Sequence, residues 1–92
     1  MCVDLRDDRI IVADRSNNRI QIFDGKGKIM RSFGSQGNGD GQLSGPFGVC
    51  ADKEGRIYVT DYHNHRVQVF DEEGRLVNLF FYYYPKEESK NK

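Results

Sequence analysis

Two stretches of this 92-residue chain share one pattern and lie 47 residues apart, and this internal repeat is the strongest constraint on the fold. The first copy runs from Arg9 to Phe33 and the second from Arg56 to Phe80. Eleven of the 25 aligned positions are identical, and five more exchange one aliphatic or basic residue for another. Self-similarity at a fixed spacing indicates that the chain is part of an array of equivalent units.

Each copy divides into four short segments with β-strand character, separated by polar or glycine-containing turns. We predict strands at 2–4, 9–13, 19–23 and 28–33 in the first copy, and at 47–52, 56–60, 66–70 and 75–80 in the second. The segments 9–13 and 56–60 are apolar almost throughout, which is typical of strands buried on both faces. A period of about 40–50 residues built from such strands predicts an all-β fold of β-propeller blades, each a four-stranded antiparallel sheet.

The repeat divides the chain into four parts. We predict a first blade at 1–33 that lacks its start, a glycine-rich and flexible inter-blade loop at 34–46, a second blade at 47–80, and a non-repeat tail at 81–92. The tail is rich in lysine and is predicted to be disordered, and we interpret it as a truncated or altered end. Two blades cannot close a ring, so the remaining blades are required and the chain alone is expected to be marginally stable or to aggregate.

Composition gives no global signal for a partner. The formal net charge is zero, so no overall field attracts the chain to nucleic acid or to a membrane. The sequence contains neither a run long enough to span a membrane nor a leader pattern. Cys2 and Cys50 occupy matching positions of the two copies, which predicts buried free thiols in a reducing compartment, the cytoplasm.

The loops at one end of the predicted blades are the candidate binding site. The loops at 14–18 and 61–65 share this end with the connection at 34–46, and we name it the top face. Its residues that differ between the copies are the candidates for binding RNA or a protein partner, because arginine and histidine pair with phosphate and aromatic rings stack on unpaired bases. Phe47 and Gln42 lie near the same rim. The candidate residues are Arg15, Asn18, Tyr62, His63 and His65.

Other top-face residues recur in both copies, which favours a structural role in each blade. Aspartate and asparagine stabilise turns through side chain–backbone hydrogen bonds, and an arginine can bridge to an aspartate of its own or the next blade. These structural repeat positions are Asp14, Asn17, Arg19, Asp61, Asn64 and Arg66. For the five candidates above, the alternative to binding is a solvated loop.

Catalytic and metal sites are not predicted. His63 and His65 are separated by one residue in a turn, which is a poor metal site without a third ligand. The glycine-rich run from Gly34 to Gly41 lacks the helix and the Gly-Lys-Ser/Thr ending of a phosphate-binding loop. No spacing in the chain brings together a nucleophile and a base.

The repeat resembles a known family. The pattern GV-x-A-D…GRIYV-x-D-x-x-NHRVQVFD-x-x-G, from Gly48 to Gly74, looks like an NHL repeat. The connection FGSQGNGDGQLSGPFGV, from Phe33 to Val49, and the stretch VADRSNNRIQIF, from Val12 to Phe23, resemble the tripartite-motif NHL proteins. This resemblance implies about two blades of a six-bladed propeller, located after a RING, B-boxes and a coiled coil that are absent here.

The resemblance also implies a function. It favours a non-enzymatic recognition module that binds RNA through the top face in post-transcriptional regulation. The alternative is a protein–protein interaction propeller that recruits substrates for an E3 ubiquitin ligase whose RING is absent here. A third reading is a fragment of an enzyme similar to the amidating lyase, which shares NHL repeats. No cofactor is expected in this segment, because zinc belongs to the RING and B-box domains.

Overall fold

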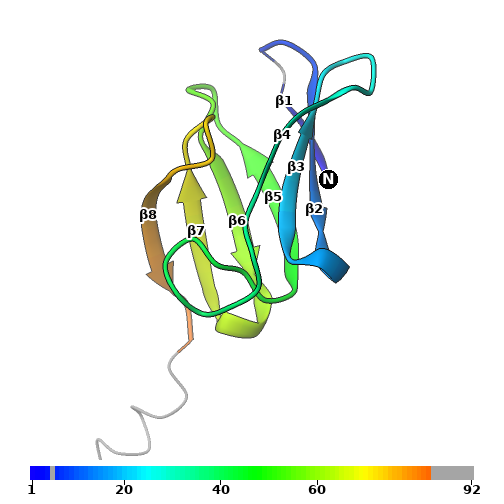
Figure 1. The fold of residues 1–92 in the computed structure, drawn as a ribbon. Helices are drawn as coiled ribbons and strands as arrows, with labels where there is room; N and C mark the ends of the chain where they lie inside the picture. Colours follow the sequence, from blue (N-terminus) through cyan, green and yellow to red (C-terminus); the bar gives the residue numbers. More distant parts are fainter. Residues whose placement is uncertain (5, 84–92) are drawn as a thin grey trace, which may run out of the picture.

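Two four-stranded antiparallel sheets make up the chain, and the computed structural model describes residues 1–4 and 6–83 (Figure 1). The first blade contains, in spatial order, β1 (Cys2–Asp4), β2 (Arg9–Asp14), β3 (Arg19–Phe23) and β4 (Ile29–Phe33). The second blade contains β5 (Pro46–Ala51), β6 (Ile57–Asp61), β7 (Arg66–Phe70) and β8 (Leu76–Phe81). Neighbours in sequence pair in both sheets, so the predicted all-β fold of two four-stranded blades is confirmed.

The predicted strands differ from the observed ones only at their ends. The predicted strand starts at Lys28, Arg56 and Arg75 belong to turns instead, because an aspartate side chain accepts each of their backbone N–H groups at 2.9 Å. Each turn has the pattern Asp-x-x-Gly-x, and Gly27 takes a positive φ of 87° that favours glycine. Phe81 belongs to β8, one residue beyond the predicted strand, and residues 84–92 of the predicted tail lie outside the described residues.

The hydrophobic core lies between the two blades, which face each other through one side of each sheet. Ile11, Ile20 and Ile22 of the first blade are buried against the second. In return, Ile57, Val59 and Phe70 of the second blade are buried against the first. The rings of Phe33 and Phe70 meet across this junction with centroids 4.9 Å apart. The junction between blades therefore supplies most of the burial that holds the sheets together.

The two cysteines differ in exposure although they occupy equivalent positions. Both thiols are free; Cys2 is partly buried at the junction, whereas Cys50 is exposed. The prediction of two buried thiols is therefore wrong for Cys50. The cause is the side of the sheet: the second blade covers the face that carries Cys2, and no described residue covers the equivalent face that carries Cys50.

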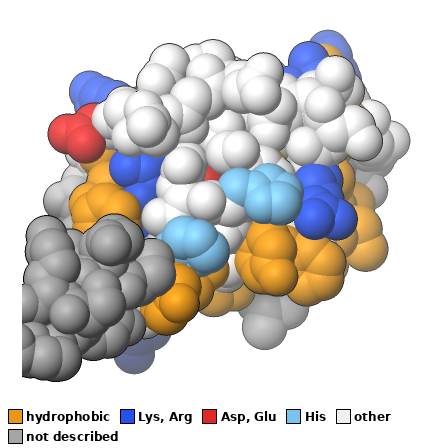
Figure 2. Space-filling view, turned by 90° about the horizontal axis from the view of Figure 1, so that it is seen from below, with side chains coloured by type: hydrophobic (Ala, Val, Ile, Leu, Met, Phe, Trp, Pro, Cys, Tyr) orange, Lys and Arg blue, Asp and Glu red, His pale blue; other side chains and the backbone are white. Residues whose placement is uncertain are grey.

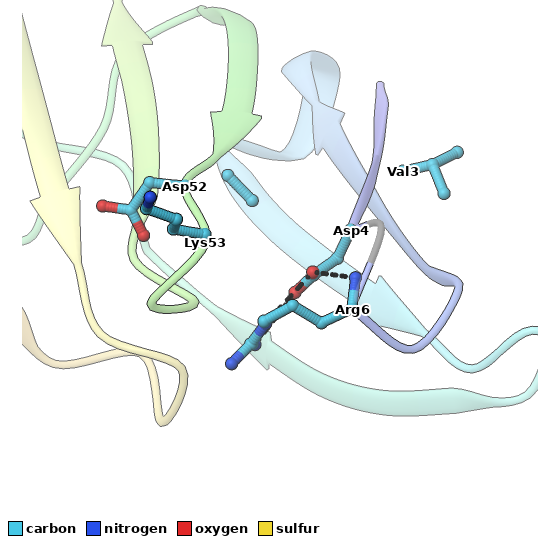
Figure 3. A pocket seen from close by; sticks show the side chains of 6 residues that line it. Val3, Asp4, Arg6, Asp52 and Lys53 are labelled. Atoms are coloured by element: carbon cyan, nitrogen blue, oxygen red, sulfur yellow. Dashed lines mark hydrogen bonds and ion pairs between the residues drawn. The ribbon is translucent and has the colours of Figure 1, made fainter.

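Ion pairs join the blades at the end opposite to the top face. Arg6 and Arg9 of the first blade reach Glu72 of the second, at 3.2 and 3.0 Å. Arg6 also donates to the buried carboxylate of Asp4 at 3.0 Å, and Asp4 and Arg6 line a hollow with Asp52 and Lys53 (Figure 3). Asp4 therefore orients the arginine that bridges the two blades.

This arrangement predicts a pH dependence of stability. The hydrogen bond from Arg6 lowers the pKa of Asp4 below its ordinary value of 3.8, so the folded chain binds that proton less tightly than the unfolded chain. The stabilising contribution is present above pH 3.8 and is lost as the pH falls through the folded pKa. We expect the free energy of unfolding to fall less steeply in Asp4→Asn than in the wild type between about pH 5 and pH 2. Urea unfolding across this range measures both slopes, and equal slopes would contradict the assignment.

Candidate binding site on the top face

The top face is built by the β2–β3 and β6–β7 loops together with the connection between the blades, and it is the lower end of Figure 1. Each loop holds one short 3-10 turn, η1 (Arg15–Asn17) or η2 (Tyr62–Asn64). Each turn ends at a residue in the left-handed region, Asn18 with φ 54° and His65 with φ 55°. The two loops thus have the same backbone and differ only in the side chains they carry.

A triad of aspartate, asparagine and arginine recurs in each blade. In the first blade, Asp14 accepts from Asn17 at 3.0 Å and from Arg19 at 2.8 Å. In the second, the equivalent Asp61 accepts from Asn64 and Arg66 at 2.9 and 2.7 Å. Each arginine therefore pairs with the aspartate of its own blade, and each triad closes its loop onto the start of the next strand.

The connection between the blades packs on the second triad. Arg66 donates to the carbonyl oxygens of Gly39 and Gln42, both at 2.8 Å, and Asp61 accepts the backbone N–H of Ser44 at 2.7 Å. As a result the side chains of Asp61 and Arg66 are 0% and 3% exposed, whereas those of Asp14 and Arg19 are 21% and 41% exposed.

Further contacts hold the stretch of the connection from Gly41 to Leu43. Gln68 donates to the Gln42 carbonyl at 2.6 Å and accepts the N–H of Gly41 at 2.8 Å. Leu43 is fully buried in the core, so the connection also has an apolar anchor. The segment predicted to be a flexible loop is therefore tied to the second blade by partly buried hydrogen bonds.

Three of the five predicted candidates lie together with a residue that sequence reasoning placed only near the rim. The Arg15 guanidinium lies 5.7 Å from the ring centroid of Phe47. The Tyr62 ring lies 6.4 Å from Phe47 and 5.3 Å from the His63 ring. We name these four residues the aromatic–arginine cluster. Arg15, Phe47 and Tyr62 line a hollow of about 300 Å³.

The cluster is open to solvent. Phe47 is 68% exposed and Tyr62 51%. Among the described residues, no hydrogen bond holds the Arg15 side chain, so its donors are available to a ligand. Figure 2 looks onto this face and shows the two histidines beside hydrophobic side chains and a basic side chain.

The other two predicted candidates lie outside the cluster and make contacts within the chain. Asn18 accepts the backbone N–H of Gly45 at 2.9 Å, which holds the end of the connection. The ring of His65 lies 5.2 Å from that of Tyr83, and its carbonyl accepts the N–H of Tyr82 at 3.0 Å. The structure thus brings Arg15, Tyr62 and His63 together and separates Asn18 and His65 from them.

Phe47 is the member of the cluster that sequence reasoning did not rank as a candidate. The sequence predicts it as the first residue of the strand at 47–52, near the rim of the top face. A bulge in β5 between Pro46 and Val49 interrupts the pairing with β6 at this residue. The neighbouring Gly48 is the one sequence signal for such a bulge.

The described part of the chain, 1–4 and 6–83, contains neither a helix long and apolar enough to cross a membrane nor a group of three His, Cys, Asp or Glu side chains placed to hold a metal.

Comparison with known proteins agrees with the repeat. The family model for the NHL repeat matches residues 1–23 and 43–70. The chain is similar to the RING finger protein nhl-1 of Caenorhabditis elegans, with 51% identity over 44 residues. This alignment covers 48% of the chain and 4% of the length of that relative. The chain belongs to the NHL-repeat family, as a two-blade module related to a RING finger NHL protein.

Proposed function

We propose that this NHL module is a non-enzymatic recognition module that binds single-stranded RNA through its top face. The observation that supports this is the aromatic–arginine cluster, in which an unpaired guanidinium lies beside exposed rings. RNA recognition depends on stacking of splayed bases on aromatic and guanidinium planes. The cluster offers both kinds of plane around one hollow.

Each member of the cluster has a separate task in this proposal. Phe47 and Tyr62 stack on a base that enters the hollow, because their exposed rings lie 6.4 Å apart and are tilted by 47°. Arg15 lies over the Phe47 ring and directs its remaining donors to a phosphate. His63 lies edge-on to Tyr62 and extends the rim toward the sugar–phosphate backbone.

The nhl-1 protein is named for a RING finger, so we propose that the module acts in the cytoplasm beside an E3 ubiquitin ligase activity held elsewhere in a larger protein. Post-transcriptional control of the bound transcripts follows from this proposal.

Selection from a randomised single-stranded RNA pool tests the proposal with the 92-residue chain. We expect enrichment of a defined motif and an affinity that falls steeply as salt rises. Arg15→Glu should weaken binding to every sequence and reduce the salt slope by about one. Tyr62→Ala should weaken binding by about 5- to 100-fold, the range of one lost base stack, with the salt slope unchanged.

Arg31→Glu is the matched control, because Arg31 is an exposed arginine on β4 that bonds the Glu73 carbonyl and lies outside the top face. It makes the same change of charge and should leave binding within about twofold. Circular dichroism confirms that each variant is folded. Absence of enrichment at low salt would exclude RNA and favour the protein-interaction surface. Equal losses in Arg15→Glu and Arg31→Glu would exclude the aromatic–arginine cluster as the RNA site.

A further inference from the structure

The last residues of the connection, directly before the phenylalanine of the cluster, are held by the second blade. Ser44 donates its N–H to the Asp61 carboxylate at 2.7 Å, and its carbonyl accepts the His63 N–H at 3.0 Å. The next two residues, Gly45 and Pro46, are buried, and the proline ring fixes its own φ. The backbone that leads into the cluster therefore has little freedom to move relative to the second blade.

The first blade holds the same segment through one side chain. Asn18 accepts the Gly45 N–H at 2.9 Å. It ends η1, three residues after Arg15, with a φ of 54° that asparagine tolerates better than most residues. The equivalent residue of the second blade is His65, whose ring contacts Tyr83 instead. The amide acceptor is therefore not among the features that the two copies share.

Gly45 lies where the loops of the two blades approach each other most closely. Its φ of 64° favours glycine, and a Cβ at this position would overlap the His63 ring. That ring lies 5.3 Å from the ring of Tyr62. Gly45 is thus enclosed by His63 of the second blade and bonded to Asn18 of the first.

We propose that Asn18 is a positioning residue for the RNA-binding cluster of the proposed function: by holding Gly45, it fixes Phe47 beside Arg15 before RNA binds. Phe47 follows Gly45 by two residues, and Asn18 follows Arg15 by three. The Asn18–Gly45 hydrogen bond therefore closes a short path between the ring and the guanidinium, which lie 5.7 Å apart. A ring that is already fixed loses less conformational freedom when a base stacks on it.

The strand ladder does not hold Phe47 in this position. The pairing of β5 with β6 is interrupted between Pro46 and Val49, so Phe47 lies in the bulge. The contacts of Ser44 come from the second blade, whereas Arg15 belongs to the first. The bond from Asn18 is the one that joins the two halves of the cluster.

Nuclear magnetic resonance of the free 92-residue chain tests the position of Phe47 without RNA. The wild type should show nuclear Overhauser contacts between the Phe47 ring and the Arg15 side chain. Asn18→Gly should lose them, because glycine keeps the left-handed backbone and removes the acceptor. Asn18→Asp should restore them, because its carboxylate accepts the same N–H. Contacts that are absent from the wild type, or that persist in Asn18→Gly, would overturn the proposal.

RNA affinity tests the consequence for the cluster. Asn18→Gly should bind the selected RNA about 2- to 10-fold more weakly than the wild type, the range expected when one side chain must be ordered on binding. The salt slope should not change, because no charge is altered. In a Phe47→Ala background, Asn18→Gly should change the affinity by less than about twofold, because no ring is left to position. Equal losses in both backgrounds would indicate a general effect on the fold and would exclude the positioning role.

Asn78→Gly is the matched control. Asn78 is an exposed asparagine on β8 whose side chain also accepts a backbone N–H, that of Leu79 at 2.8 Å, and it lies outside the cluster. This variant should keep the Arg15–Phe47 contacts and leave RNA affinity within about twofold.

Two further outcomes separate the positioning role from the fold and from the proposed function. If Asn18→Gly does not fold, the wild-type spectra decide: the Arg15–Phe47 contacts together with a Gly45 N–H protected from hydrogen exchange support the role, and their absence overturns it. A wild type that binds no RNA would exclude the proposed function, and the spectra alone would then decide how Phe47 is held. RNA binding that is equal in the wild type and Asn18→Gly would overturn only the positioning role.

Discussion

Asp61→Ala is expected to lower the free energy of unfolding by about 3–5 kcal/mol. The Asp61 carboxylate accepts four donors, from the Ser44 backbone and from the side chains of Asn64, Arg66 and Gln68, at 2.7 to 3.2 Å. Its removal leaves the guanidinium of Arg66, 3% exposed, without its carboxylate. Breaking one partner of a buried ion pair costs about 3–5 kcal/mol, and a whole small domain is stable by about 5–15 kcal/mol.

Asp14→Ala is the matched control, because Asp14 is the same residue of the triad in the first blade. The Asp14–Arg19 pair has almost the same length, 2.8 Å, but its arginine is 41% exposed. Exposed pairs contribute about 0–1 kcal/mol. Urea unfolding followed by circular dichroism measures both variants at one protein concentration. Equal losses would show that burial by the connection does not determine the strength of the triad.

Phe70→Ala is the second large effect, with an expected loss of about 3–5 kcal/mol. Phe70 is 1% exposed and lies at the centre of the junction, where its ring meets that of Phe33 at 4.9 Å. Deleting it opens a cavity in the core that both blades share. We therefore expect the two blades to unfold in one transition and not one after the other.

Phe47→Ala serves as its control, because it deletes the same ring at a site that is 68% exposed. A change within about 0.5 kcal/mol is expected for this surface position. Thermal melts followed by near- and far-ultraviolet circular dichroism measure both variants. A loss of near-ultraviolet signal in Phe70→Ala with an unchanged melting temperature would contradict the central role of the junction.

The strands and their order could be predicted because the repeat fixes them twice. The alternation of Ile20 and Ile22 and of Val67 and Val69 defines a sheet face in each copy, and the offset aligns them. The strand ends at Lys28 and Arg56 could not be placed, because they depend on a hydrogen bond that the backbone N–H donates to an aspartate side chain. Such a bond is local, but periodicity does not reveal it.

The composition of the candidate site was only partly predictable. Loop residues that differ between copies pointed to Arg15, Tyr62 and His63, and these residues do lie together. Asn18 has the same sequence signal, yet its side chain holds the backbone of Gly45, a contact 27 residues away. Phe47 required the bulge in β5 to become exposed. The first difference arises from packing of the connection and the second from the bulge, and the repeat pattern describes neither.

The way the connection packs also tells an engineer where to cut. Most of its hydrogen bonds run to the blade that follows it, to Asp61, Arg66 and Gln68. One bond runs to the preceding blade, from the Gly45 N–H to Asn18. A transferable cassette therefore begins at Gly34, directly after β4, and ends with β8 at Phe81. Chimeras joined at the start of β5 would separate a buried arginine from the carbonyl groups that solvate it. Joins after β4 would keep these bonds and lose only the one between Asn18 and Gly45.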